Sequence, residues 1–110
     1  MVGSLRSSTI KEERKMGGKY KYICYCDLSP EGNKVDQEGW KKYFEKEDKL
    51  LKENEIKAVF RGVPFGVSES YVTVYESDKY IDDLISVLQE AGRGDYVQAA
   101  RTITVTPFAW

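Results

Sequence analysis

Alternating apolar and polar residues divide the chain into four predicted strands. We place them at residues 19–28, 57–65, 70–76 and 101–106. Tyrosine, isoleucine, valine, threonine and cysteine are dense in these segments, and turn-forming Gly, Pro, Ser and Asn residues punctuate the chain between them.

Two helices are predicted between these strands, because apolar residues recur there every three or four positions. The first helix begins after Asp36, a residue type that caps helix N-termini. Glu47 interrupts its apolar stripe at a position where an apolar residue is expected; the stripe itself consists of Trp40, Tyr43, Phe44, Leu50 and Leu51.

The second helix has the most regular helical spacing in the chain. Ser77 or Asp78 is expected to cap its start, and Gly92 is expected to end it. Asp95 and Gln98 follow with capping-box spacing, which predicts a further short helical turn over residues 96–100.

The order of these elements, β-α-β-β-α-β, predicts the α+β fold class. It is typical of a ferredoxin-like sandwich, in which an antiparallel sheet carries both helices on one face. We expect one such domain over residues 19–110. Residues 1–18 are rich in charged residues, serine and glycine, so a disordered N-terminal extension is expected there.

Because side chains alternate across a strand, each predicted strand has a helix-facing set and an opposite set. We assign the aliphatic and cysteine positions to the helices, namely Cys24, Cys26, Ala58, Phe60, Val72, Val74, Ile103 and Val105. The opposite face then receives Tyr25, Asp27, Val59, Arg61, Tyr71, Thr73, Tyr75, Thr102, Thr104 and Thr106.

This opposite set is too aromatic for a sheet that faces water and too polar for a core. We therefore expect another surface to cover it, and a homodimer through the sheet face would do so. A small-molecule cavity between the paired sheets is compatible with the same residues. The alternative is that the face serves as the binding platform of a monomer.

The element order, the extra turn after the second helix and the Thr-rich last strand resemble the dimeric α+β barrel superfamily. That superfamily includes antibiotic-biosynthesis-type monooxygenases and muconolactone-isomerase-like proteins. The resemblance covers residues 19–108 and implies a sheet-to-sheet homodimer with a cavity beside each sheet. Active members oxidise or isomerise small, often aromatic, molecules. Haem-degrading and chlorite-dismutase-like relatives need an axial histidine, so their activities are not implied for a chain that has none.

Asp27 and Arg61 are the candidate catalytic residues. Arginine would hold a carboxylate or enolate, and aspartate would accept a proton. The structural alternative is that Asp27 caps the turn after the first strand and Arg61 forms an ion pair across the dimer interface. The candidate pocket-lining residues are Tyr25, Tyr71, Thr73, Tyr75 and Thr104.

These candidates favour a cofactor-free oxygenase-like or isomerase-like enzyme, or a binder of a small aromatic or carbonyl molecule. The competing hypothesis is a non-enzymatic effector-binding or assembly module whose sheet face is purely a dimer interface. No cofactor or metal is expected under either hypothesis.

The chain contains no histidine, which excludes Ser-His-Asp and Cys-His nucleophiles, His-rich zinc sites and His-ligated haem. Its two cysteines, Cys24 and Cys26, stand at i and i+2, so their Cα atoms would lie about 6.6 Å apart on a strand. We interpret them as small core residues of a protein in a reducing compartment, with soft-metal binding or redox chemistry as the alternative.

Charge and hydropathy limit the partners. Seventeen basic and 18 acidic residues give a formal net charge of −1, which provides no basic face for nucleic acid. No run of about 18 apolar residues occurs, so no membrane span is expected, and no secretory signal is recognisable. These features predict a cytoplasmic protein.

Overall fold

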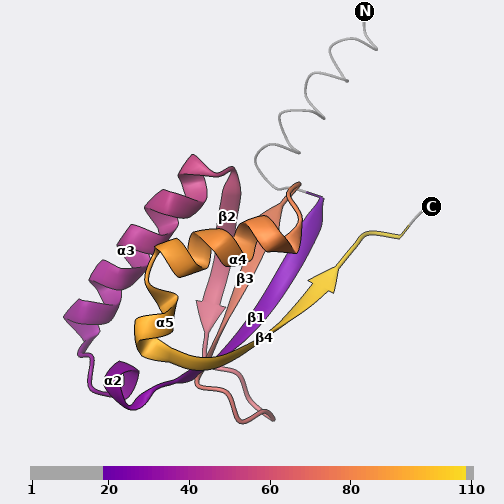
Figure 1. Ribbon diagram of the computed structural model, residues 1–110. Helices are drawn as coiled ribbons and strands as arrows, with labels where there is room; N and C mark the ends of the chain where they lie inside the picture. Colours follow the sequence, from indigo (N-terminus) through magenta and orange to yellow (C-terminus); the bar gives the residue numbers. More distant parts are fainter. Residues whose placement is uncertain (1–18, 109–110) are drawn as a thin grey trace, which may run out of the picture.

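The computed structural model describes residues 19–108, so the predicted extension over residues 1–18 lies outside the described part. Figure 1 shows one sheet with helices packed on one of its faces. In chain order the elements are β1 (Tyr20–Leu28), α2 (Pro30–Asn33), α3 (Gln37–Glu53), β2 (Ile56–Gly62), β3 (Tyr71–Ser77), α4 (Ile81–Glu90), α5 (Arg93–Tyr96) and β4 (Val97–Val105).

The sheet is antiparallel throughout, with strand order β2-β3-β1-β4. The two long helices, α3 and α4, lie on the same face of this sheet (Figure 1). The predicted ferredoxin-like α+β sandwich is therefore confirmed. None of the helices within residues 19–108 has the length and apolar character needed to span a membrane.

The predicted start of α3 is confirmed in atomic detail. Asp36 has an extended backbone, and its Oδ1 accepts a hydrogen bond of 2.8 Å from the Gly39 amide. This side chain satisfies one of the amides that the first helical turn leaves without a partner.

Three local predictions are wrong. The turn residues after β1 form the short helix α2, whose first turn is capped by Ser29. Neither Ser77 nor Asp78 caps α4, whose N-cap residue is Tyr80; the buried Ser77 hydroxyl bonds Glu55 O and the Lys79 amide instead. The short helical turn expected over residues 96–100 occurs earlier, as α5 (Arg93–Tyr96), and residues 97–100 are strand because pairing of β4 with β1 extends back to Val97.

The predicted facing of β2 fails because the strand contains a bulge. Ala58 pairs with Tyr75 and Phe60 pairs with Val74, so Val59 is the extra residue. One extra residue reverses the facing of every side chain beyond it. Phe60 consequently points away from the helices, and Arg61 points toward them.

The predicted facing of β3 and β4 is also wrong, and the register shows why. Tyr71, Thr73 and Tyr75 pair with Cys26, Cys24 and Tyr22, which are buried under the helices. Paired residues of an antiparallel ladder share a face, so the tyrosines point inward and Val72 and Val74 point outward. By the same pairing, Thr102 and Thr104 lie on the helix side, and Ile103 and Val105 on the other.

We call the helix-covered side of the sheet the inner face and the other side the outer face. The core lies between the inner face and the helices. Leu51 of α3 and Leu84, Val87 and Leu88 of α4 pack there against the hydrophobic core residues of the sheet, which are Tyr22, Cys24, Cys26, Ile56, Tyr75 and Val97.

The outer face has an apolar row that crosses all four strands. The row runs from β2 to β4 through directly paired residues: Phe60, Val74, Ile23 and Ile103. No described element covers it, and Phe60 and Ile103 keep 63% and 44% of their surface exposed. The predicted uncovered second face is thus real, but its composition is aliphatic rather than tyrosine-rich.

Candidate functional site

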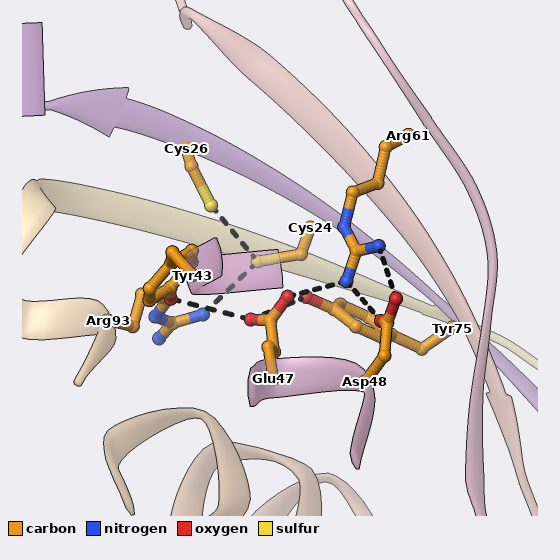
Figure 2. Close-up of polar contacts among 8 residues, drawn as sticks. All are labelled: Cys24, Cys26, Tyr43, Glu47, Asp48, Arg61, Tyr75 and Arg93. Atoms are coloured by element: carbon orange, nitrogen blue, oxygen red, sulfur yellow. Dashed lines mark hydrogen bonds and ion pairs between the residues drawn. The ribbon is translucent and has the colours of Figure 1, made fainter. Parts of the chain in front are cut away.

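A polar cluster lies between α3 and the inner face (Figure 2). At its centre is Glu47, whose side chain leaves the middle of α3 toward the sheet and is 1% exposed. Arg61 Nη2 donates to Glu47 Oε2 at 2.6 Å, and the hydroxyls of Tyr43 and Tyr75 lie 3.5 Å from Oε1. The charge that breaks the apolar stripe of α3 is therefore paired inside the protein.

Arg61 is fixed by contacts on several sides. Its Nη1 and Nη2 atoms donate to Asp48 at 3.2 and 2.6 Å, in addition to the contact with Glu47. Its guanidinium lies over the ring of Phe44, with the central carbon 4.3 Å from the ring centroid. Its buried Nε–H has no hydrogen-bond partner among the described residues.

Burial shapes the titration of this cluster. Desolvation raises the pKa of Glu47, and the charge of Arg61 opposes that rise. Burial also raises the pKa of Tyr43 and of Tyr75, with the charge of Glu47 as a further cause. Both phenols consequently remain protonated donors for the Glu47 carboxylate at neutral pH.

The Glu47→Gln variant is expected to gain stability relative to the wild type as the pH rises. Since the pKa of Glu47 is raised above its ordinary value of 4.5, the folded state holds this proton more tightly than the unfolded chain. The free energy of unfolding of the wild type therefore falls as the pH rises through the interval above 4.5. Glutamine at this position does not titrate, so the free energy of unfolding of the variant lacks this dependence on pH.

Urea unfolding of both proteins between pH 4 and pH 8 measures this difference. Groups remote from Glu47 titrate alike in the two proteins and cancel when one curve is subtracted from the other, whereas Cys24, whose pKa the charge of Glu47 raises, contributes to the difference as well. Parallel curves across this range would show that Glu47 titrates at its ordinary pKa in the folded protein.

A second cluster contains the two thiols. Cys24 Sγ and Cys26 Sγ lie 3.7 Å apart on the inner face of β1. Arg93 Nη1 and Thr102 Oγ1 each lie 3.4 Å from Cys24 Sγ, in donating positions. The hydrogen bonds from Cys26 and Thr102 and the charge of Arg93 lower the pKa of Cys24 against the effect of burial.

A pocket of about 320 Å³ opens between α3 and the ends of β1, β2 and β3. Its walls are mostly apolar, and three aromatic rings from α3 and β3 form one side. The lining residues are Leu28, Trp40, Phe44, Arg61, Gly62, Val63, Ser70 and Tyr71. Such a pocket can stack a flat ring, and the guanidinium can hold a carboxylate or enolate.

The two predicted catalytic residues lie on opposite faces of the sheet. Arg61 belongs to the inner cluster, whereas Asp27 lies on the outer face beside Tyr25, in a hollow of about 140 Å³. The prediction that one cavity holds both residues is therefore wrong, and the bulge at Val59 is the physical reason.

The predicted pocket-lining residues are also divided. Tyr71 lines the pocket described above, and Thr73 and Tyr75 are fully buried beneath the helices. Thr104 lies on the inner side by register but is exposed, because it stands near the free end of β4. Sequence reasoning missed the roles of Trp40 and Phe44 as pocket walls.

Sequence comparison gives no relative: no known protein family and no curated protein matches this chain. Solved structures do match its fold. A chlorite dismutase variant from Candidatus Nitrospira defluvii aligns with a TM-score of 0.63 and 16% identity over 92% of this chain and 48% of the other. The chain thus spans about half the length of that enzyme.

Two further solved structures match over nearly their whole length. An Arabidopsis thaliana protein gives a TM-score of 0.58 with 10% identity, over 83% of this chain and 97% of the other. A protein of unknown function from Rhodopseudomonas palustris gives 0.55 with 14% identity, over 92% of both chains. At such identities the likeness concerns the fold alone. These matches therefore support the ferredoxin-like fold of this chain.

Proposed function

We propose that the protein is a homodimer in which each subunit binds a small aromatic or carbonyl-containing acid in the pocket between α3 and the sheet. The observation that carries this proposal is the pairing of aromatic walls with Arg61 in one pocket. The buried Nε–H of Arg61 has no partner among the described residues, and a buried donor without an acceptor is costly unless a ligand supplies one.

The size of the pocket limits the ligand. Its volume of about 320 Å³ lies near the lower end of the range of about 300–1,000 Å³ that is usual for small-molecule sites. A molecule with one ring and a carboxylate or enolate group suits this volume. Its ring would stack on Trp40, Phe44 or Tyr71, and its oxygens would face Arg61.

The pocket favours binding over turnover. Cofactor-free isomerisation or oxygenation would use Arg61 to stabilise a developing enolate, and its fixed position between Glu47 and Asp48 suits that role. Such a reaction also needs a group that accepts a proton from the substrate. No carboxylate is among the described residues that line the pocket. We therefore favour an effector-binding role and keep the enzyme as the second candidate.

The outer face supports the homodimer. Its apolar row crosses every strand, and an uncovered apolar surface of this kind is typical of an interface. Charges of both signs border the row, with Lys21 and Glu76 paired on one side and Arg101 and Glu69 on the other. Charges of alternating sign can pair with themselves across a two-fold axis. We assign Tyr25 and Asp27 to this interface.

We also place the protein in the cytoplasm. Both cysteines are free although their sulfurs lie 3.7 Å apart. Thiols so close together persist most readily in a reducing compartment.

The ligand proposal is tested by adding a charge at the rim of the pocket. Val63 lines the pocket and is 71% exposed, so the fold tolerates a polar residue there. We expect Val63→Glu to bind benzoate and phenylpyruvate about tenfold more weakly than Val63→Gln, because only the glutamate repels an anion beside Arg61. Benzamide, which is neutral, should not distinguish the two variants.

Fluorescence of Trp40 reports binding, since this residue forms part of the pocket wall. Trp110 is the other tryptophan of the chain and is replaced by phenylalanine in all proteins compared. Equal affinities of both Val63 variants for the anionic probes would contradict the role of Arg61. Absence of binding by every aromatic probe at millimolar concentration would contradict the proposed function.

A further inference from the structure

We propose that Cys24 and Cys26 form a binding site for one soft monovalent metal ion, such as Cu(I), held in linear coordination between the two sulfurs. Both side chains leave β1 on the inner face, and their sulfurs point toward one another at 3.7 Å (Figure 2). Metal–thiolate bonds are about 2.3 Å long, so a linear arrangement needs the sulfurs about 4.6 Å apart. The proposal therefore requires the two cysteine side chains to rotate apart from their 3.7 Å separation.

The charges around the sulfurs match this ion. Arg93 places a partly buried guanidinium 3.4 Å from Cys24 Sγ and forms no ion pair with a carboxylate among the described residues. A buried cation requires a nearby anion. Two thiolates, one monovalent cation and the guanidinium together carry no net charge. A divalent cation would leave an uncompensated positive charge in the core.

The number and type of ligands point to the same class of metal. No group of three or more metal-binding side chains occurs within residues 19–108, and the chain contains no histidine. Zinc prefers four ligands, and calcium and magnesium prefer oxygen. Thiolate ligands select soft ions, and Cu(I) is the soft monovalent ion of biological metals.

The surroundings of the sulfurs suit bound thiolates. Thr102 Oγ1 stands 3.4 Å from Cys24 Sγ and can donate to it, and Tyr71 lies beside Cys26. Donors in this outer position orient metal-binding thiolates. Both cysteines are essentially inaccessible to water, so a bound Cu(I) ion would be protected from ligand exchange and oxidation.

Binding changes bonds but not oxidation states. Each thiol loses its S–H bond and forms one S–Cu bond, and the two protons pass to the solvent. The copper enters as Cu(I) and remains Cu(I). No co-reactant is needed.

The experiment is an anaerobic competition for Cu(I) between the reduced full-length protein and bicinchoninate. We expect the wild type to remove one Cu(I) per chain from the coloured complex. Cys24→Ser and Cys26→Ser should no longer do so, and circular dichroism shows whether they are folded. Met16→Leu, which removes a thioether outside the described residues, should bind like the wild type. An equal concentration of Zn(II) should not displace the copper.

Arg93 provides a matched pair of variants. Arg93→Gln removes the charge beside Cys24 and should weaken Cu(I) binding about 10- to 100-fold, as loss of an outer partner does at other metal sites. Arg93→Lys keeps the charge and should restore most of the affinity. If Arg93 had only a structural role, Arg93→Gln and Arg93→Lys would bind Cu(I) with equal affinity as long as both proteins remained folded.

Failure of the wild type to take Cu(I) from bicinchoninate would overturn the proposal, whatever the variants do. Binding of the same stoichiometry and affinity by the folded Cys24→Ser or Cys26→Ser protein would also overturn it. Either result leaves the ligand pocket beside Arg61 unaffected, because the thiols do not line that pocket.

Discussion

Lysine in place of Ile103 is expected to convert the proposed dimer to a monomer, whereas lysine in place of the neighbouring Thr104 should leave that dimer intact. Ile103 ends the apolar row on the outer face and pairs directly with Ile23. Thr104 stands on the opposite side of the same strand and is exposed. A sheet-to-sheet pairing would therefore bury only the lysine at position 103.

The expected effect is large because a lysine in an apolar interface loses its water without gaining a partner. We expect the dissociation constant of the dimer to rise at least about 100-fold in Ile103→Lys, equivalent to about 2.8 kcal/mol. Monomer stability should change little, since Ile103 is 44% exposed in the subunit and lies on the edge strand β4.

Sedimentation velocity at micromolar concentration measures the outcome. The wild type and Thr104→Lys should sediment at twice the chain mass of 12.6 kDa, and Ile103→Lys at that mass. A wild-type monomer under these conditions would contradict the homodimer. Dissociation by Thr104→Lys but not by Ile103→Lys would show that the subunits meet through a surface other than the outer face.

The sequence was sufficient to predict the elements and their order, because each rests on local signals. Asp36 and the stripe that follows it predicted α3 correctly, and the regular spacing around Leu84 and Leu88 predicted α4. Helix periodicity is robust, since one polar residue within an apolar stripe, such as Glu47, changes the direction of the apolar face only slightly.

The face of the sheet to which each strand side chain points could not be predicted as reliably. The side-chain period in a strand is two residues, so one bulge or one wrong assumption about composition reverses a whole face. The bulge at Val59 leaves no recognisable trace in the sequence. In β3 the aliphatic residues were assumed to face the helices, yet the register with the buried residues Tyr22 and Cys26 places tyrosines there.

The error in facing changes where function is expected. The predicted site lay between subunits, and the structure instead gathers polar and aromatic residues within one subunit, beneath α3. Glu47 was visible in the sequence as a break in an apolar stripe, but its partner Arg61 lies 14 positions away on a strand of unpredictable facing. Arg93 lies 69 positions from Cys24, so only the tertiary fold unites them.

The substitution Gly32→Ala is expected to destabilise the fold by about 3 kcal/mol, at the upper end of the cost of inserting a methyl group into a packed site. A Cβ atom at Gly32 would lie 2.1 Å from the carbonyl oxygen of Tyr96 and 3.2 Å from its Cα atom. The same carbonyl accepts a 2.9 Å hydrogen bond from the Ser29 amide, so it cannot move away without losing that bond. Relief would require α2 and α5 to separate.

Gly94 is the matched control, because it lies on α5 but a Cβ atom there meets nothing within 4 Å. Gly94→Ala is expected to leave stability unchanged or to raise it by up to about 1 kcal/mol through higher helix propensity. Urea unfolding at one fixed protein concentration compares the two variants, since the proposed dimer would make stability depend on concentration. Similar free energies of unfolding for Gly32→Ala and Gly94→Ala would contradict close packing of α2 on α5. A loss confined to Gly32→Ala would show that close packing of α2 on the carbonyl of Tyr96 stabilises the fold.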